Sequence, residues 1–172
     1  MKASMERIRK LVLHPLFQEQ AAFLKDAEKD RIFCRHSIEH LLDVARIMYI
    51  YNLEDGCRLN RELIYAAALL HDIGRPDQIR YQTPHPAAGA RIAGIILPEC
   101  GFSPEDTRRI QHAISGHRSL QQTGDPLSEY LCRADKQSRC CFCCPAFESC
   151  NWPEEKKKQT DRILKKRRNR SI

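Results

Sequence analysis

The sequence predicts an all-α protein that folds as a single helical bundle of about six to eight helices. Its 172 residues contain only two valines and four threonines, whereas leucine, alanine, glutamate, arginine and lysine are abundant. This composition favours helices over strands. Apolar residues also recur at helical spacing in several segments. The length fits one domain with a hydrophobic core of its own.

Two helices are expected in the first half of the core. One covers about residues 36–51, where apolar side chains recur every three or four positions. The other contains the apolar run 65–70, with Asn60 as its N-cap and with Gly74 and Pro76 as its stop signals.

Three further helices are expected after a polar loop at residues 75–84. The first of them is stopped by Pro98 and Gly101. The next begins at Ser103, a good N-cap that is followed by a proline and two acidic residues. The last begins at Asp125, which also precedes a proline.

The chain divides into four segments by composition. We expect an N-terminal helical segment (1–30), a main domain (31–139), a cysteine-rich segment packed on that domain (140–155) and a basic tail (156–172). The tail holds nine of the 29 lysines and arginines, which leaves the preceding residues with a net charge near −1. It is interpreted as a solvated end, with binding to RNA, anionic lipid or an acidic partner as the alternative.

The sequence indicates neither export nor membrane insertion. No segment is long and apolar enough to cross a bilayer, and the apolar run at residues 11–13 is broken by His14 and Pro15. We therefore expect a cytoplasmic protein without a membrane partner. In that compartment the nine cysteines are free thiols or metal ligands rather than disulfides.

Side chains that bind metals recur on the apolar sides of the predicted helices. His71 and Asp72 stand together in the last turn of the second helix, after five apolar residues. An acidic side chain in that setting needs a compensating cation or a water-filled cleft. Each of the other four helices offers a histidine or an aspartate as well. One such residue is usually a satisfied core group, whereas five helices together indicate a shared metal site in the core cleft. The candidate residues are His36, His40, His71, Asp72, His85, His117 and Asp135.

The order His40, His71-Asp72 and Asp135 resembles the HD superfamily of metal-dependent phosphohydrolases, in which H…HD…D binds one metal. His40 fits the first position because Val44-Ala45 follows it, as in the family's H-x-x-x-V-A. The segments around His85 and His117 resemble the two added histidines of the dinuclear subgroup, which includes HD-type diadenosine tetraphosphate hydrolases. The resemblance spans about residues 31–139 and implies an HD-domain bundle with six ligands.

Histidines outside this set have other expected roles. His36 becomes an additional histidine that supports the ligands or contacts substrate. His112 lies about 140° round the helix from His117, so we expect it at the surface. His14, beside a proline, is expected to be structural.

The resemblance implies one or two divalent transition metals, which the ligand types do not narrow beyond Fe, Mn, Co, Ni or Zn. Asp72 is the expected bridge, and a metal-bound hydroxide would attack phosphorus. We expect a small phosphorylated substrate, such as a nucleotide, to be held by Arg75, Arg118 and Lys136 beside His36. Two alternatives stay open. One is an HD-fold di-iron oxygenase, and the other is a regulatory or RNA-associated module in which the metal is structural.

Six of the nine cysteines fall between residues 132 and 150. Within this stretch, C-x-x-C pairs are followed by a further cysteine. This pattern is compatible with a site in which thiolates bind either a structural zinc ion or an iron–sulfur cluster. The expected ligands are Cys34, Cys141, Cys144 and Cys150, with Trp152 packed nearby. Reduced thiols without a metal are the alternative. Cys57 and Cys100 are interpreted as ordinary core or loop residues.

Overall fold

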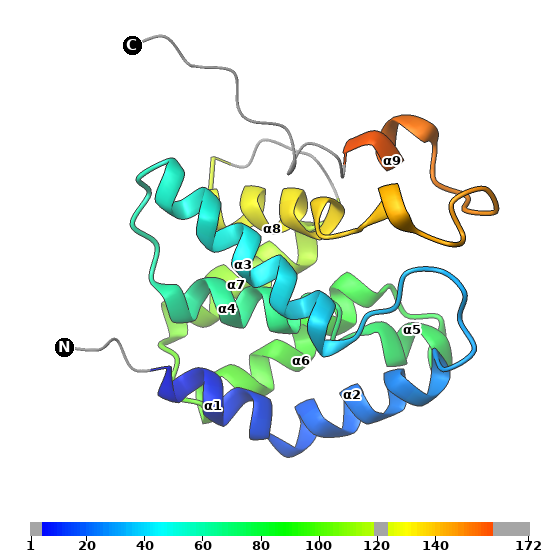
Figure 1. Ribbon diagram of the computed structural model, residues 1–172. Helices are drawn as coiled ribbons and strands as arrows, with labels where there is room; N and C mark the ends of the chain where they lie inside the picture. The colour runs from blue at the N-terminus through cyan, green and yellow to red at the C-terminus, as the bar shows by residue number, and fades with distance from the viewer. Residues whose placement is uncertain (1–4, 119–123, 160–172) are drawn as a thin grey trace, which may run out of the picture.

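The computed structural model describes residues 5–118 and 124–159, and these residues form helices and loops without a β-strand. The all-α prediction is therefore confirmed (Figure 1). The elements are α1 (Glu6–Leu13), α2 (Pro15–Ala27), α3 (Ile38–Glu54), α4 (Arg61–Leu70), α5 (Arg75–Tyr81), α6 (His85–Glu99), α7 (Pro104–Gly116), α8 (Pro126–Gln137), the 3₁₀ turn η1 (Cys141–Cys143) and α9 (Glu154–Gln159).

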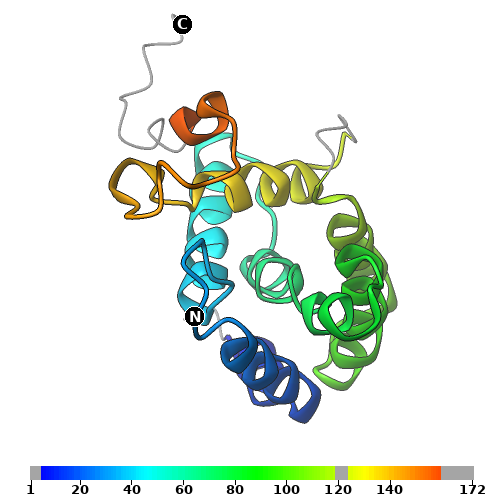
Figure 2. The same cartoon turned by 90° about the vertical axis from the view of Figure 1, so that its right-hand side faces the viewer.

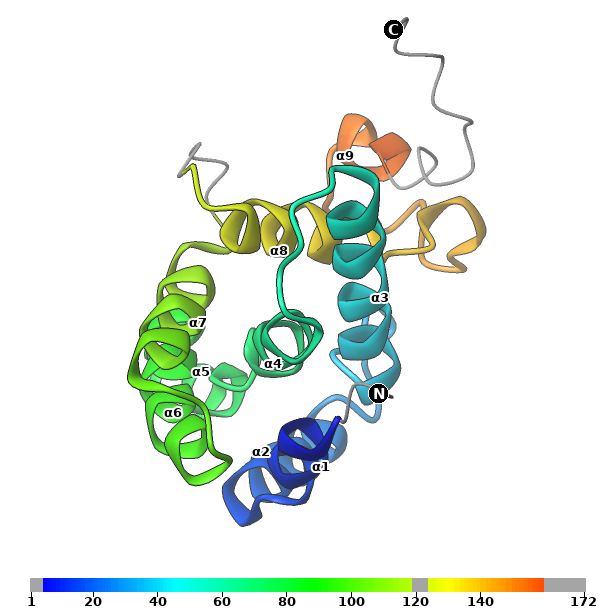
Figure 3. The same ribbon diagram turned by 90° about the vertical axis from the view of Figure 1, so that its left-hand side faces the viewer.

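Helix α4 runs through the middle of the bundle. Figures 2 and 3 show it nearly end-on, with the other core helices arranged around it. It contacts α1, α3, α7 and α8, and Ile64, Leu69 and Leu70 are among the largest fully buried side chains of the described residues. The last five residues of α4, from Ala66 to Leu70, are all apolar and all buried, and such a stretch is stable in water only when other helices cover it. His71 and Asp72, the two residues that follow α4, therefore lie at the centre of the molecule.

The predicted helix starts at Asn60, Ser103 and Asp125 are confirmed. The side chain of Asn60 accepts a hydrogen bond from the N–H of Glu62 (2.8 Å). Ser103 and Asp125 accept equivalent bonds at the starts of α7 and α8. Each cap satisfies an N–H that the first helical turn leaves without a partner.

The predicted loop at residues 75–84 is wrong in its first part, because residues 75–81 form α5. Pro76 occupies the first turn of this helix, where its missing N–H costs no hydrogen bond and its fixed φ suits the helix. The proline therefore begins a helix here instead of ending one. Only a short connection, residues 82–84, separates α5 from α6.

Two other predicted boundaries also shift. Pro98 lies inside α6, which ends at Glu99 rather than before the proline. Gly101 follows with a φ of +87°, the left-handed conformation that glycine adopts after a helix. The helix expected over residues 36–51 instead spans α3, with Ser37 as its N-cap residue.

Gly74 allows the end of α4 to approach α6 closely. A Cβ atom at this position would lie 2.3 Å from the carbonyl oxygen of His85 and 2.4 Å from the backbone nitrogen of Gly89. Both neighbours are backbone atoms, which cannot rotate away. The glycine thus permits the contact that brings His71 and Asp72 close to His85.

The C-terminal segment passes over α8 and ends, in the described residues, with α9 (Figure 1). The basic run at residues 165–168 and the end of the tail lie outside the described residues. Within residues 5–118 and 124–159, none of the helices combines the length and the apolar character that a membrane span requires.

We predict that Gly74→Ala destabilises the protein by about 3 kcal/mol, because the added methyl group would collide with backbone atoms on α6. Gly116→Ala is the matched control. A Cβ there meets nothing within 4 Å, so the change should be neutral or slightly stabilising within the helix. Urea unfolding followed by circular dichroism measures both. Equal stability of the two variants would contradict the close approach at Gly74.

Candidate metal centre

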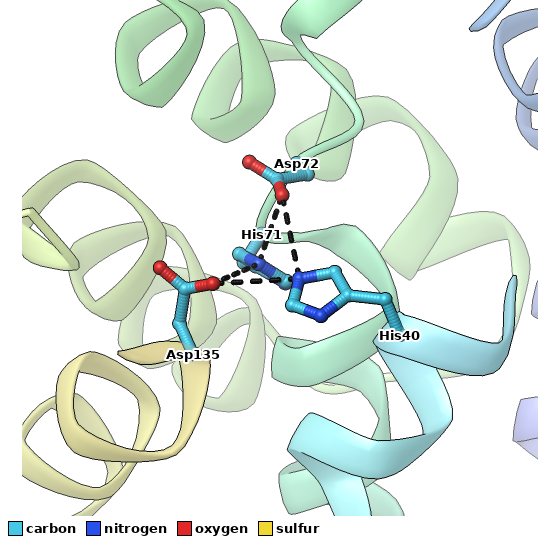
Figure 4. A group of neighbouring side chains, drawn as sticks. All are labelled: His40, His71, Asp72 and Asp135. Atoms are coloured by element: carbon cyan, nitrogen blue, oxygen red, sulfur yellow. Dashed lines mark ion pairs between the residues drawn. The ribbon is translucent and has the colours of Figure 1, made fainter. Parts of the chain in front are cut away.

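Four of the predicted ligands meet where α3, the end of α4 and α8 converge (Figure 4). One ligand atom from each of His40, His71, Asp72 and Asp135 lies within 4.8 Å of the others. His71 Nε2 is 3.1 Å from Asp72 Oδ2, and His40 Nε2 is 3.4 Å from Asp135 Oδ1. Two imidazoles and two carboxylates at this spacing suit one divalent metal ion.

A second group adjoins the first and shares Asp72 with it. Ligand atoms of Asp72, His85 and His117 also lie within 4.8 Å of one another. His85 Nε2 is 3.5 Å from Asp72 Oδ1, whereas Oδ2 of the same carboxylate faces the first group. The two oxygens of Asp72 therefore point toward two adjacent ligand sets, as a bridging carboxylate requires.

All four ligand histidines are anchored through Nδ1, which leaves Nε2 directed into the centre. The Nδ1–H groups of His71 and His117 donate to backbone carbonyls at 2.7 and 2.6 Å. The Nδ1–H of His40 donates to the Ser138 hydroxyl, which itself donates to the carbonyl of Asp135. Such bonds fix the tautomer and the ring orientation that metal ligation needs.

The fourth histidine, His85, is anchored by a side chain on α5. Its Nδ1 lies 2.8 Å from Oε1 of Gln78, which accepts the Nδ1–H. The segment that the sequence predicts as a loop is thus a helix that supplies a partner for a ligand. Neither the spacing nor the polarity of Gln78 distinguishes it from an ordinary surface glutamine.

The polar atoms in this centre fit bound metals. His71 Nε2 and Asp72 Oδ2 are buried, and although they lie 3.1 Å apart, neither makes a hydrogen bond, whereas buried polar atoms are normally satisfied. The Nε2 atoms of His85 and His117 face each other at 3.2 Å, and with both Nδ1 atoms carrying hydrogen the two lone pairs would repel. A cation between these atoms removes both problems.

The pKa of His71 is shifted in the opposite direction from the pKa values of His40 and His85. Burial acts to lower the pKa of His71, but the carboxylates of Asp72 and Asp135 outweigh it and raise the value to about 10. Burial dominates at His40 and His85 and lowers their pKa values to about 4 and about 3. Burial acts to raise the pKa of Asp72, but the charge of His71 holds it well below its usual range. The carboxylate is therefore charged and available to a metal.

His36 is held against the centre by a buried carboxylate that the sequence analysis missed. Its Nδ1 lies 2.6 Å from Oε1 of Glu28, and its Nε2 is 3.9 Å from Asp72 Oδ2. Burial lowers the pKa of His36. Glu28 lies eight residues upstream at the end of α2, so no helical spacing links the two residues in sequence.

A cavity of about 500 Å³ opens beside the centre, and His36, His85, His117 and Asp135 are among its lining residues. The predicted substrate residues Arg75, Arg118 and Lys136 line it too. Nε of Arg75 donates to Asp72 Oδ1 at 2.7 Å. The cations expected to hold a substrate thus share one cavity with the predicted ligands.

Arg139 is a further cation of the cavity that the sequence analysis missed. It is buried, and its Nη2 donates to His40 Nε2 at 3.1 Å. That nitrogen is the one His40 directs toward Asp135, so the guanidinium and a divalent cation compete for one position. The signal available in sequence was the spacing of four residues from Asp135, which would place both on one side of a continuing helix, although α8 ends at Gln137.

The histidines outside the site have the expected settings. His112 is exposed on α7. The side chain of His14 accepts a hydrogen bond from the N–H of Leu16 at the start of α2 and contacts Glu99. A structural role for His14 follows from these contacts.

The cysteines expected to bind a second metal lie on the same cavity. Cys34, Cys141, Cys144 and Cys150 all line it. In the described part of the chain, the groups of three or more ligand atoms within 4.8 Å include no cysteine, so these thiols are not gathered as tightly as the histidines. Cys100 is buried, and Cys57 is exposed with its sulfur 3.0 Å from the Tyr130 hydroxyl.

The fold and the site together describe an all-α protein with two adjoining groups of histidine and aspartate side chains that could hold metal ions. A family model described as "HD domain" matches residues 37–140, more than half of the chain. The chain belongs to the HD domain family.

The chain is also similar to proteins from two bacteria and to one crystal structure. An uncharacterized protein of Clostridium beijerinckii is 41% identical over 133 residues, which cover 77% of this chain and 83% of that relative. A bifunctional uridylyltransferase/uridylyl-removing enzyme of Bradyrhizobium diazoefficiens is 40% identical over 63 residues, 36% of this chain and 6% of the enzyme. A crystal structure of a predicted HD superfamily hydrolase from an uncultured Thermotogales bacterium has the same fold, with a TM-score of 0.64 and 23% identity. The match covers 89% of this chain and 85% of that one.

We predict that the metal-free protein becomes less stable as the pH falls from about 6.5 toward 4. His40 and His85 take up protons near pH 6.5 when unfolded, but their folded pKa values are about 4 and about 3. Burial also lowers the pKa values of His36 and His117. His71 acts oppositely: its stabilisation is complete below about pH 6.5 and is lost as the pH rises through about 10. The four histidines with lowered pKa values outweigh the one with a raised pKa. Thermal unfolding of chelator-treated protein should therefore show a lower Tm at pH 5 than at pH 7. A higher Tm at pH 5 would contradict these directions.

We also predict that Gln78→Ala weakens metal binding at the group formed by Asp72, His85 and His117 by about 10- to 100-fold, because His85 loses its anchor. The group that contains His40 should keep its affinity and serves as an internal control. Calorimetric titration of the chelator-treated variant with Mn²⁺ measures both sites. Equal weakening of the two sites would count against separate groups.

Proposed function

We propose that the protein is a metal-dependent phosphohydrolase that cleaves a nucleotide or another small phosphate ester. One observation carries the proposal: two ligand groups share Asp72 beside a cavity whose charged lining is almost entirely cationic. Two adjacent divalent metals are a common solution for displacement at phosphorus.

The charge of the cavity lining supports an anionic substrate. Among the described residues, seven cationic side chains and a single carboxylate, that of Asp135, line the cavity. Because Asp135 also belongs to a ligand group, the open part of the cavity is positively charged. Phosphate groups match such a lining better than neutral or cationic compounds. The cations are Arg31, Arg75, Arg118, Lys136, Arg139, Lys156 and Lys157.

Aromatic side chains on the same cavity support a nucleotide. Phe33, Phe147 and Trp152 line it together with the cations. A flat ring is a suitable stacking partner for a base, while the cations contact the phosphates. The volume of about 500 Å³ is within the range of small-molecule sites.

The ligand side chains define the reaction centre. His40, His71, Asp72 and Asp135 would hold one metal ion, and Asp72, His85 and His117 a second. When bound, divalent metals lower the pKa of water and neutralise negative charge on a phosphoryl group. The buried Nδ1 anchors keep the imidazoles from rotating, so the ligand geometry exists before substrate arrives.

Residues around the ligands would orient the substrate and handle protons. Arg75 holds Asp72 by one nitrogen, and its guanidinium has further donors for a phosphate oxygen. Arg118 is exposed on the cavity lining, where it can contact a more distant phosphate. His36, held by Glu28, has its Nε2 free to accept a proton from water as the nucleophile forms.

The names of relatives are compatible with this chemistry. One relative is named as a uridylyl-removing enzyme, and removal of a uridylyl group breaks a bond between phosphorus and oxygen. The structural relative is named as a predicted hydrolase. We extend only the reaction class, hydrolysis at phosphorus, to this chain.

We predict that Asp72→Asn lowers kcat by about 1000-fold, equivalent to about 4 kcal/mol of transition-state stabilisation, because both metal groups lose a charged ligand. The assay measures phosphate or nucleotide release from a panel of nucleotides and phosphate monoesters, after chelation and reloading with Mn²⁺, Co²⁺, Ni²⁺, Fe²⁺ or Zn²⁺. Asp26→Asn is the matched control, because the Asp26 side chain is 82% exposed.

Two results would overturn the proposal. Oxygen consumption without phosphate release, measured aerobically and anaerobically with iron-loaded protein, would favour an oxygenase. Full metal content and full activity in Asp72→Asn would show that the centre is not the site of reaction.

A further inference from the structure

The segment between α8 and α9 has little hydrophobic core to hold it. Residues 138–153 contain one short 3₁₀ turn, and among their apolar side chains only Cys141 and Ala146 are buried. Phe142 is 54% exposed. A connection of this length without helices or strands is uncommon in a compact domain unless it is functional or fixed in another way.

The cysteines of this segment fall into two groups by location. Cys141, Cys144 and Cys150 line the cavity, and Cys34, from the loop before α3, joins them. Cys140 and Cys143 are exposed and do not line it. The segment therefore turns three of its five cysteines inward, toward a fourth that is distant in sequence.

The backbone explains how three cysteines reach one side. The N–H of Cys144 donates to the carbonyl of Cys141 at 3.2 Å, and the N–H of Phe147 donates to Cys144 at 3.0 Å. The N–H of Cys150 then donates to Phe147 at 3.4 Å. These hydrogen bonds close three successive turns, each between residues three positions apart. The turns bring Cys141, Cys144 and Cys150 to the side of the segment that lines the cavity. Nε of Arg31 donates to the carbonyl of Cys34 at 2.9 Å and ties down the opposite loop.

Cationic side chains line the same cavity as the four cysteines. Arg31, Lys156 and Lys157 line the cavity beside the four cysteines. Four thiolates around a divalent cation carry a net charge of about −2, and neighbouring cations stabilise that charge. The ammonium group of Lys157 also donates to the carbonyl of Phe147 at 2.6 Å, which fixes it against the segment.

We propose that Cys34, Cys141, Cys144 and Cys150 bind a second metal centre through four thiolates, separate from the histidine and aspartate groups. Cys34 precedes residues 37–140, the extent of the HD domain match, and the other three follow it. The centre therefore ties together both flanks of the domain and fixes the C-terminal segment as one wall of the cavity. The free energy of metal binding would stabilise the folded segment, which has little hydrophobic core of its own.

Two kinds of centre use four thiolates, a zinc ion and an iron–sulfur cluster. Zinc, with Zn–S bonds of about 2.3 Å, draws its sulfur atoms close together. No three cysteine sulfurs among the described residues lie within 4.8 Å of one another, so zinc requires the thiols to rotate inward. A cluster has its cysteines on separate iron atoms and accepts a wider spacing.

The test is metal analysis of the full chain purified without oxygen. We expect either one zinc per chain bound by sulfur or iron with an equal amount of inorganic sulfide, in addition to metal at the histidines. The double variant C141S/C144S should lose this metal. The matched double variant C140S/C143S, which removes the exposed pair of identical spacing, should keep it.

X-ray absorption at the zinc and iron edges of the unmodified protein keeps the proposal testable if C141S/C144S does not fold. Sulfur neighbours at about 2.3 Å support it, and only nitrogen and oxygen neighbours overturn it. Equal metal content in the two double variants overturns it as well. Asp72→Asn distinguishes this centre from the proposed active site, because that variant should lose metal at the histidines and retain the sulfur-bound metal.

Discussion

The buried carboxylate of Asp72 is the constraint on which the rest of the structure depends. Only 2% of the residue is exposed, and it lies at the end of the most buried helix of the bundle. A charge in that position is costly unless cations surround it. Arg75 contacts one oxygen, His71 faces the other, and two ligand groups meet at the same carboxylate. The charge of Asp72 therefore lies where two candidate cation positions adjoin it.

The fold delivers this arrangement through ordinary helix packing. The apolar end of α4 must be covered by other helices, and two of the helices that contact it, α3 and α8, each carry a candidate ligand. His40 comes from α3, Asp135 from α8, and His85 from α6, which approaches closely because residue 74 is a glycine. Hydrogen bonds from Nδ1 then orient each imidazole. The packing of the helices into a bundle therefore also brings the candidate ligands together.

Local signals in the sequence were sufficient for the helical class and the N-caps, because helical spacing and capping depend on neighbours in the chain. The grouping of candidate ligands came instead from their recurrence on five predicted helices and from the resemblance to the HD superfamily. Local signals were insufficient wherever a partner comes from another element. Glu28 and Gln78 hold His36 and His85 across element boundaries, and nothing in their own sequence context marks them. The helix at residues 75–81 was missed for a different reason: Pro76 serves equally to end one helix or to begin the next.

We propose that Asp72 joins two adjacent metal ions. Anomalous scattering from crystals of the native protein, recorded on both sides of the absorption edges of the candidate metals, tests it most directly. We expect two peaks about 3.5–4 Å apart, one beside His40 and Asp135 and one beside His85 and His117, with an oxygen of Asp72 at each. A single peak that Asp72 does not contact, or a histidine cluster without a metal in protein purified without chelators, would contradict it.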